Sequence, residues 1–544
     1  MRKAFRFAAL LVTVVLVAGS CTSPPTGDRP RALAGSPWME AACSLPIDYL
    51  RRIRRGYAPG RGHDLQMVAR APNYFGGFSN WSHSGPWPYL QRIPLVLYGP
   101  GFIRSQGEIS LDREVTTVDI APTIAELTGT TMPAGRPGTA ITEALVPANQ
   151  RPERPRVIMT IVWDGGGGNV LDRWPNAWPE LERIGDMGTS ITNATVGSSP
   201  SVTPAVHTNL GTGAYPRAHG IVDIPMRKRG RFPEAFSDMD PQSVRISALA
   251  DDYDKSTDNA ALIGMLAEHK WHLGMIGHGA SIEGGDRDLA VMFDRETGVP
   301  ITNRKYFSLP GYFLRELALE DFVRPVDADD GKIDGKWLGH RLNDAASQVE
   351  SPVFLAYQSA AIRLLLERGG YGIDDVTDLF FTNFKQIDLL GHQYNMASRE
   401  VESALHYSDR GIGDIVEWLD QNVGANRWVI ILTADHGQTP RAQATGGWPI
   451  SLNEVVADVN RQMEGSEPRS VLKARPVGLW LSRHAREPRN ARRIARFLAD
   501  YRLRDNVPAG EEIPSAYRTK RNSRLFAAAI PSRDLDRVWT CATR

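Results

Sequence analysis

The chain contains apolar runs that alternate with segments of helical periodicity, and this alternation restricts the fold more than any other feature. Residues 156–163 are rich in apolar and β-branched side chains and end at Asp164, which a run of glycines follows. Similar apolar runs cover residues 93–98, 379–383 and 428–433. Strands that are buried on both faces of a parallel sheet have this near-continuous apolar character. We therefore predict four buried parallel strands.

Helical patterns occupy residues 260–269, 353–367, 398–419 and 491–501. Strands that alternate with helices are typical of an α/β fold with helices on both faces of a mostly parallel sheet. We therefore expect a three-layer α/β/α sandwich. Ligands bind such sheets at the carboxyl ends of the strands, where Asp164 and Asp435 fall.

Two further segments differ in composition from the alternating strands and helices. Residues 226–349 are polar and carry few strong strand patterns, so we expect a cap inserted over the site. Residues 133–155 contain several prolines and glycines, which is typical of a linker. The length of 544 residues allows one large domain or two to three smaller ones.

The charge balance restricts the partners of the protein. Lysine and arginine together number 63, and aspartate and glutamate together number 62. Proteins that bind nucleic acid usually carry a basic surplus, so nucleic-acid binding is not expected.

The N-terminal residues have the features of a bacterial export signal, which we assign to residues 1–21. A basic start precedes the apolar residues 7–19, which are too few to span a bilayer comfortably. The sequence Ala18-Gly19-Ser20-Cys21 resembles a relaxed lipobox, so we expect a lipid on Cys21 and a place on the outer face of the bacterial cell membrane. The alternative is ordinary signal-peptidase cleavage nearby and a secreted protein. Residues 22–40 would then form a flexible tether.

The two remaining cysteines, Cys43 and Cys541, lie near the two ends of the expected folded region. An exported protein occupies a compartment in which disulfides persist. We therefore expect these cysteines to pair and to connect the termini. The alternative is a pair of buried free thiols.

Side chains that bind metals follow the predicted strands. Asp388 and His392 are four residues apart, one helical turn, so both can reach one ion. The adjacent Asp435 and His436 at a strand end can bind a neighbouring ion. Two divalent cations roughly 3.5–4 Å apart form a common type of phosphoryl-transfer site. Mixed imidazole and carboxylate ligands favour zinc over magnesium or calcium.

A candidate nucleophile, Thr203, precedes Pro204 and a predicted helix at residues 205–211. Its hydroxyl would lie at a helix N-terminus, where backbone N–H groups and the helix dipole favour an anion. A metal-bound threonine hydroxyl at such a place can ionise and attack phosphorus.

These motifs together resemble the alkaline phosphatase superfamily, and most of all its type I phosphodiesterase/nucleotide pyrophosphatase branch. The nucleophile region corresponds to Thr203-Pro-Ala-Val-His207, Gly211-Thr-Gly-Ala-Tyr-Pro216 and His219-Gly-Ile221. The later motifs correspond to Asp388-x-x-Gly-His392 and Asp435-His436-Gly437 in order and spacing. The resemblance implies two zinc ions, one held by Asp164, Thr203, Asp435 and His436, the other by Asp388 and His392.

The second zinc requires one more histidine, which in this family follows the Asp-His-Gly motif. The downstream candidate, His484, lies in a charged segment of surface character. Residues 81–101 and 118–129 instead resemble the C-terminal block of the family, although they lie upstream of the other motifs. We therefore assign His83 as the last ligand and infer a natural circular permutation.

The permutation gives a division of the chain into parts. Residues 41–132 would be the displaced C-terminal part of the catalytic domain, and residues 156–544 would be its main part. Residues 133–155 would join the old ends. A disulfide between Cys43 and Cys541 would close the break again.

The resemblance implies a zinc-dependent hydrolase of a small-molecule phosphate ester that acts through a phosphothreonine on Thr203, and the N-terminal signal implies that this hydrolase is exported. Many members bind a non-bridging oxygen with an asparagine just past the His-Gly-Ile motif, which this chain lacks, so Asn209 and His278 are our candidates for that role. The loop also lacks a clear Lys/Arg pair, which favours diesters or pyrophosphates. A threonine nucleophile argues against a sulfatase. The alternatives are a phosphomonoesterase and a non-catalytic, metal-loaded surface lipoprotein.

Overall fold

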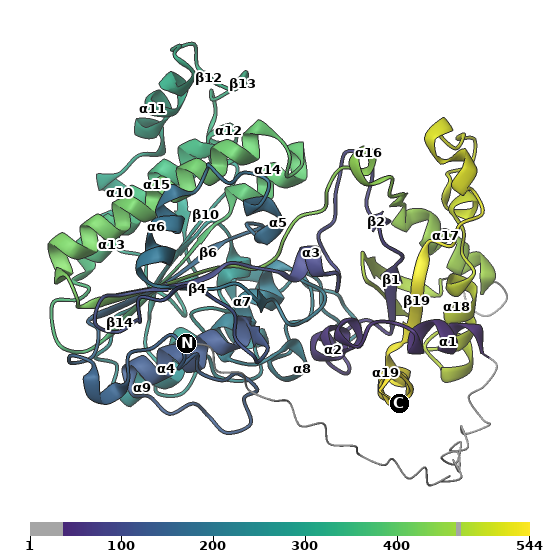
Figure 1. The fold of residues 1–544 in the computed structure, drawn as a ribbon, viewed down its shortest axis with the longest axis horizontal. Helices are drawn as coiled ribbons and strands as arrows, with labels where there is room; N and C mark the ends of the chain where they lie inside the picture. Colours follow the sequence, from purple (N-terminus) through teal and green to yellow (C-terminus); the bar gives the residue numbers. More distant parts are fainter. Residues whose placement is uncertain (1–35, 464–468, 544) are drawn as a thin grey trace, which may run out of the picture.

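The computed structural model describes residues 36–463 and 469–543, which form two lobes (Figure 1). The larger lobe contains a nine-stranded sheet and the smaller lobe a four-stranded sheet. The predicted export signal, Cys21 and most of the tether lie outside the described residues. Within the two described ranges, no helix is both long and apolar enough to cross a membrane.

The large sheet is mixed and mostly parallel. The order of its strands is β11 (Pro300–Ile301), β10 (Leu289–Phe293), β9 (Ile263–Ala267), β14 (Asp378–Phe384), β6 (Val157–Trp163), β15 (Trp428–Ala434), β3 (Leu95–Tyr98), β7 (Thr189–Ile191) and β4 (Gly107–Ile109). The central strand β6 pairs in parallel with β14 and β15 along its whole length. Every residue of these three strands is buried, as their apolar character predicts.

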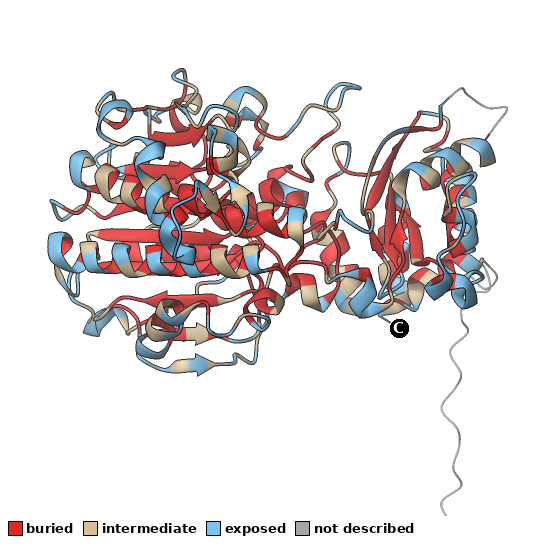
Figure 2. Cartoon of the chain, turned by 90° about the horizontal axis from the view of Figure 1, so that it is seen from above, coloured by how far each residue is buried: buried red, intermediate tan, exposed pale blue. Residues whose placement is uncertain are grey.

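Helices cover both faces of this sheet and complete the predicted three-layer sandwich (Figure 2). Side chains of α6 (Pro179–Met187), α13 (Pro352–Gly369) and α15 (Arg399–Leu419) pack in one apolar core. Side chains of α4 (Ile120–Thr128), α7 (Thr203–Thr212) and α9 (Leu249–Ser256) pack in a second core on the opposite face. The α/β sandwich expected from the sequence is therefore confirmed.

The helix ends follow from local chemistry. The Ser398 hydroxyl accepts a hydrogen bond from the backbone N–H of Val401 at 3.3 Å and so caps the start of α15. Pro352 occupies the first turn of α13, where no N–H partner is needed. Gly370 ends the same helix with a φ of 79°, a conformation that glycine adopts without strain.

Two of the predicted elements are wrong. Residues 260–269 contain the strand β9 in place of a helix, since a short apolar run does not distinguish a buried strand from a buried helix. Residues 93–98 contain β3, which runs antiparallel to both β15 and β7 instead of parallel. The direction of a strand depends on its connections, which the apolar run does not encode.

The segments expected as a cap and a linker also contribute to the sandwich. Residues 226–349 supply β9, β10 and β11 at one edge of the sheet. Their later part forms the short helices α10 (Phe313–Glu316), α11 (Val323–Asp327) and α12 (Ala345–Val349). In the expected linker, Ile141 and Leu145 are buried in the second core. The division into cap and linker stays a prediction.

The smaller lobe brings together residues that are far apart in the sequence. Its sheet has the order β17 (Val471–Arg475), β18 (Gly478–Leu481), β1 (Leu65–Ala69) and β19 (Phe526–Pro531). The upstream strand β1 pairs antiparallel with two downstream strands, β18 and β19. α1 (Pro37–Cys43), α17 (Leu452–Gln462) and α18 (Pro488–Ala499) complete the core of this lobe. The sequence did not predict this second sheet.

A disulfide connects the two ends of the described chain. It joins Cys43 at the end of α1 to Cys541 in α19 (Leu535–Ala542), with a Cα–Cα distance of 5.6 Å. This is the pair that the sequence led us to expect. The residues that precede β1 and those that follow β19 are therefore held together in one lobe.

Candidate metal centre

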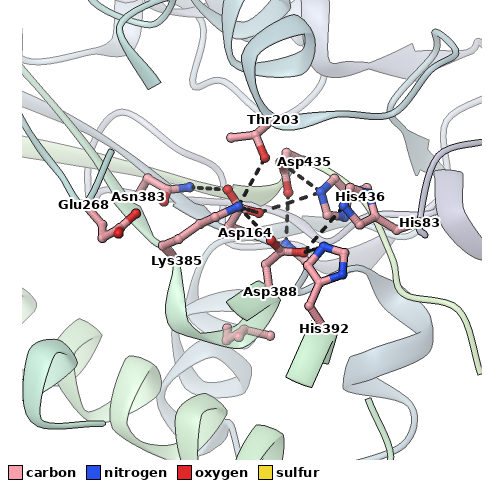
Figure 3. A network of polar contacts seen from close by, with 12 residues as sticks. His83, Asp164, Thr203, Glu268, Asn383, Lys385, Asp388, His392, Asp435 and His436 are labelled. Atoms are coloured by element: carbon pink, nitrogen blue, oxygen red, sulfur yellow. Dashed lines mark hydrogen bonds and ion pairs between the residues drawn. The ribbon is translucent and has the colours of Figure 1, made fainter. Parts of the chain in front are cut away.

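The centre lies where the three middle strands of the large sheet end (Figure 3). The register pairs Trp163 of β6 with Phe384 of β14 and with Ala434 of β15. The residues that follow are Asp164, Lys385 and Asp435, so the parallel sheet places these three side by side. This is the arrangement expected at the carboxyl ends of parallel strands.

The first group of candidate ligands consists of Asp164, Asp435 and His436. The Nε2 atom of His436 lies 3.7 Å from Oδ1 of Asp164 and 3.3 Å from Oδ2 of Asp435. All three side chains are completely buried. Burial and the nearby Asp164 carboxylate raise the pKa of Asp435 well above its ordinary value. Two buried carboxylates this close to each other are stabilised by a cation.

The second group contains Asp388 and His392, both on α14 (Gln386–Tyr394). They are one helical turn apart, and Nε2 of His392 lies 3.5 Å from Oδ1 of Asp388. The His83 ring reaches the same carboxylate from the upstream part of the chain, with its Nε2 atom 3.7 Å from Oδ1 of Asp388. Side chains from two distant segments thus converge on one carboxylate oxygen.

His83 is oriented for a role as a ligand. Its Nδ1 atom lies 3.1 Å from the carbonyl oxygen of Ser201, so Nδ1 donates a proton and Nε2 keeps a free lone pair. Its ring stacks on that of His436, with the ring centroids 3.6 Å apart. Burial, and then the neighbouring His436, hold the pKa of His83 well below its ordinary value. The neutral form is the one that binds metals.

Thr203 is the first residue of α7, and it is 3% exposed. Pro204 follows it in the first helical turn, where a proline costs no hydrogen bond. The Thr203 hydroxyl oxygen lies 3.2 Å from Nζ of Lys385, the side chain that also contacts Asp164. The candidate nucleophile therefore lies at the metal centre, at the N-terminus of a helix.

Lys385 is a member of the centre that the sequence reasoning missed. Its ammonium group donates to Asp164 Oδ1 at 2.9 Å and to Asp388 Oδ2 at 2.7 Å, in addition to Thr203. Burial alone would lower the pKa of Lys385, but the carboxylates of the centre raise it above its ordinary value. The spacing of three residues between Lys385 and Asp388 is the signal that was available, since such residues share one helix face.

Two further polar side chains connect Asp164 to the helix of the nucleophile through hydrogen bonds. The Asn383 amide donates to Asp164 Oδ2 at 3.2 Å and to His207 Nε2 at 3.0 Å. His207 in turn donates from Nδ1 to the carbonyl oxygen of Thr203 at 2.8 Å. This chain of hydrogen bonds links the carboxylate to the first turn of α7. It fixes the nucleophile and the ligand relative to each other.

The centre fits divalent metal ions. Oδ2 of Asp435 and Nε2 of His436 are buried and have no hydrogen-bond partner, although both are polar. A metal ion would satisfy both atoms, together with Asp164 and Thr203. Imidazole and carboxylate donors at His83, Asp388 and His392 would hold a second ion. Imidazole and carboxylate donors of this kind suit divalent transition-metal ions.

The two candidates for binding a substrate oxygen have other partners. The Asn209 side-chain amide lies within hydrogen-bond distance of Nε2 of His219 and Oγ of Ser198. His278 pairs with Asp251 at 2.7 Å and also contacts the carbonyl oxygen of Val244. All hydrogen bonds described for these two side chains thus go to groups outside the candidate metal ligands.

Comparison with known families agrees with this geometry. The pattern of the family described as "Type I phosphodiesterase / nucleotide pyrophosphatase" matches residues 158–534. The chain belongs to this family. It is thereby a member of the alkaline phosphatase superfamily. The match contains every candidate ligand except His83, which lies upstream of it.

The curated proteins to which the chain is similar include the following two. It is 23% identical over 367 residues to "Alkaline phosphatase PafA" of Elizabethkingia meningoseptica, which covers 57% of this chain and 65% of the relative. It is 23% identical over 341 residues to a protein of Myroides odoratus named "Calcium-transporting ATPase", which covers 53% of this chain and 61% of that relative. The chain thus matches less than two thirds of the length of either relative.

Among solved structures, the fold is similar to that of wild-type alkaline phosphatase PafA. The TM-score is 0.52 at 16% sequence identity, and the match covers 70% of this chain and 84% of that structure. This likeness supports the fold alone. The nine-stranded sandwich is therefore an alkaline phosphatase-like fold.

Proposed function

We propose that this member of the family is a zinc-dependent phosphoric ester hydrolase that acts through a phosphothreonine on Thr203. One observation carries the proposal. The buried hydroxyl of Thr203 and six candidate ligands, contributed by segments from His83 to His436, converge at the carboxyl ends of β6, β14 and β15. A site of this composition suits in-line attack on phosphorus.

The chemistry divides into two displacements. The Thr203 oxygen forms a bond to phosphorus and the bond between phosphorus and the leaving-group oxygen breaks, so the leaving group departs with the electron pair and takes up a proton. Water then attacks phosphorus, the bond to Thr203 breaks, and inorganic phosphate or a phosphomonoester is released while Thr203 regains its proton. Zinc, when bound, would stabilise the attacking and leaving oxygens.

The chain's own residues prepare the first displacement. The N-terminus of α7 presents backbone N–H groups and the positive end of the helix dipole to an anion. The hydrogen bonds from Asn383 and His207 connect the nucleophile's helical turn to Asp164. The reacting groups are thus held in place before the substrate binds, which lowers the entropic cost of the reaction.

The decisive experiment compares the wild type with Thr203→Ala on a panel of esters. We expect the wild type to hydrolyse p-nitrophenyl phosphate, bis(p-nitrophenyl) phosphate or a thymidine phosphodiester, and a chelator to abolish the activity. Thr203→Ala should abolish turnover and leave the zinc content of the protein near normal. Retained turnover in the variant would remove Thr203 from the role of nucleophile.

A phosphomonoesterase and a phosphodiesterase or pyrophosphatase are both compatible with the site. The curated relative PafA is named an alkaline phosphatase, whereas the family takes its name from phosphodiesterases. The same panel separates the two classes. If no ester is hydrolysed in a chelator-sensitive manner, the remaining alternative is a non-catalytic, metal-loaded surface lipoprotein.

We also propose that the protein is exported and carries a lipid on Cys21. The disulfide between Cys43 and Cys541 supports an oxidising compartment. Mass spectrometry of the mature N-terminus tests the proposal, since a lipid adds a defined mass to Cys21. An N-terminus that still begins at Met1 would contradict export.

The circular permutation is likewise our proposal. Three facts support it: His83 reaches the centre from upstream of Asp164, β3 lies between β15 and β7, and the disulfide joins the two ends of the described chain. A chain that begins near residue 133, continues to residue 543 and then through residues 37–132 keeps every core segment, including Ile141 and Leu145, and should fold and bind two zinc ions. Failure to bind both ions would contradict the proposal.

A further inference from the structure

The ammonium group of Lys385 is a fixed positive charge inside the centre that the proposed mechanism does not use. Lys385 directly precedes α14 and is 2% exposed. Its three hydrogen bonds connect the two groups of ligands, since Asp164 belongs to the first and Asp388 to the second. A charge buried at this cost of desolvation requires compensating contacts, and here they all belong to the reaction centre.

The position of Lys385 relative to the nucleophile is the central observation. Its Nζ atom lies 3.2 Å from the Thr203 hydroxyl oxygen. A phosphorus atom in position for attack lies roughly 3–3.5 Å from that oxygen. When phosphorus approaches that oxygen on the side of Nζ, one of its phosphoryl oxygens comes within hydrogen-bond reach of the same ammonium group.

Figure 3 shows that Lys385 and the histidines approach the centre from opposite sides. His83, His392 and His436 lie on one side of the carboxylates, and Lys385 extends toward them from the other. Oδ1 of Asp388 faces two of these histidines, whereas its Oδ2 accepts from Lys385. The ammonium group thus contacts an oxygen of Asp388 that the histidines leave free.

Other basic side chains of the lobe have different partners. Arg295 pairs with the buried Glu268, and Arg92 pairs with Asp172. In the described ranges, Lys385 is the basic residue whose charged nitrogen contacts Thr203. This chain lacks the asparagine that binds a non-bridging oxygen in many members of the family. Asn209 and His278 have partners elsewhere, which leaves this contact to Lys385.

We propose that Lys385 binds a non-bridging oxygen of the phosphoryl group and so favours phosphate monoesters over diesters. This inference rests on the proposed function. A monoester carries close to two negative charges at neutral pH and three non-bridging oxygens. A diester carries one charge and only two such oxygens. An additional ammonium group at the nucleophile therefore stabilises the monoester more strongly.

The alternative role for Lys385 is to hold the carboxylates in place and nothing more. In that case its removal would weaken zinc binding, or would reduce the hydrolysis of both ester classes by the same factor. A direct contact with the phosphoryl group predicts a different pattern, because the loss then depends on the charge of the substrate. The two roles can be separated with measurements on the full chain.

The test uses Lys385→Met and Lys385→Arg, with Lys336→Met as the control. Lys336 lies on a surface hairpin and pairs with Asp334, so its variant removes one positive charge far from Thr203. For each protein, we would measure zinc per chain, kcat/KM for p-nitrophenyl phosphate and for bis(p-nitrophenyl) phosphate, and the affinity for inorganic phosphate by calorimetry.

For Lys385→Met we expect unchanged zinc content and a loss of about a hundredfold in kcat/KM for the monoester. For the diester we expect a loss of about tenfold at most, and phosphate should bind at least about tenfold more weakly. Lys385→Arg keeps the charge and should retain more monoester preference than the methionine variant. Lys336→Met should behave as the wild type.

Equal losses for both esters, or loss of zinc from both Lys385 variants, would overturn the inference in favour of a purely positioning role. If Lys385→Met does not fold, as judged by circular dichroism, Lys385→Arg decides by comparison with the wild type: a lower ratio of monoester to diester kcat/KM supports the contact, and equal losses for both esters overturn it. The failure of the proposed function gives a different result, namely a zinc-loaded wild type that hydrolyses neither ester. If the wild type hydrolyses neither ester, the affinity for phosphate still tests the inference. An unchanged affinity in Lys385→Met would overturn it.

Discussion

Replacement of Asp254 by asparagine is expected to stabilise the protein at pH 8 and to leave its stability unchanged near pH 4. Asp254 lies on α9, remote in sequence from the metal ligands, and is 3% exposed. One carboxylate oxygen from each of Asp254, Asp286 and Asp288 lies within 4.8 Å of the others. Oδ1 of Asp254 is buried without a hydrogen-bond partner. Ionisation of this side chain is therefore unfavourable in the folded state.

The magnitude follows from the pKa of Asp254. Burial, and then the charges of Asp286 and Asp251, raise this pKa from 3.8 to about 7. Between these two values the folded protein binds more protons than the unfolded chain, so the free energy of unfolding decreases as the pH rises through the window. The full interval corresponds to about 4 kcal/mol. Since Asp286 is exposed and its charge is screened, we expect about half of this, ~2 kcal/mol.

Asparagine resembles the neutral acid at every pH. The variant therefore avoids the free-energy cost of ionising a buried carboxyl group. Above pH 7 the variant should therefore be more stable than the wild type by ~2 kcal/mol, which corresponds to roughly 2 °C in the melting temperature of a chain of this length. Below pH 4 the two proteins should melt together. Thermal unfolding at pH 4, 6 and 8 measures the difference, with a chelator present throughout so that metal binding does not add its own pH dependence.

The control is Asp112→Asn, which removes an exposed carboxylate and should change stability little at any pH. Three results would refute the reasoning on Asp254. The variant could be destabilised at pH 8, or its effect could be independent of pH. Alternatively, without the chelator, calcium could stabilise the wild type but not the variant, which would mean that a cation and not a proton neutralises the three carboxylates.

Two further predictions concern the metal centre and the termini. His83→Ala should reduce bound zinc from two ions per chain to one, because it removes one of three ligands from the second group. Elemental analysis after dialysis measures the zinc content. Two tightly bound ions in this variant would exclude His83 as a ligand. The oxidised protein, denatured without reductant, should show no free thiol from Cys43 or Cys541, and the Cys43→Ser, Cys541→Ser double variant should lose about 2–4 kcal/mol of stability. A count of two free thiols would contradict the disulfide.

The central part of the fold was predictable because its strands are buried on both faces. β6 and β15 have no polar face, so the apolar run identifies each strand and the polar residue after it identifies the strand's end. The motif Asp435-His436 then falls at the carboxyl end of a parallel strand, which is where such sheets bind ligands. Long amphipathic helices such as α15 were equally clear, since their periodicity extends over many turns.

The smaller lobe was not predictable for the opposite reason. Its strands are short, and β1 finds its partners β18 and β19 more than 400 residues further along the chain. Only tertiary packing brings such segments together, so no local sequence pattern predicts this sheet. β9 was missed because five apolar residues between other elements suit a strand or a helix equally well until their neighbours are known.

Lys385 was missed because a local pattern does not show which distant residues a side chain will contact. Two features of the sheet and the helix could nevertheless have identified it. A lysine before a helix is normally solvated, and no motif drew attention to it. However, Lys385 follows a strand that pairs in register with β6, so it must end beside Asp164. It also precedes Asp388 by three residues and therefore shares a helix face with a metal ligand. In this protein the register of the sheet and the spacing along the helix together direct Lys385 into the centre, where it is 2% exposed.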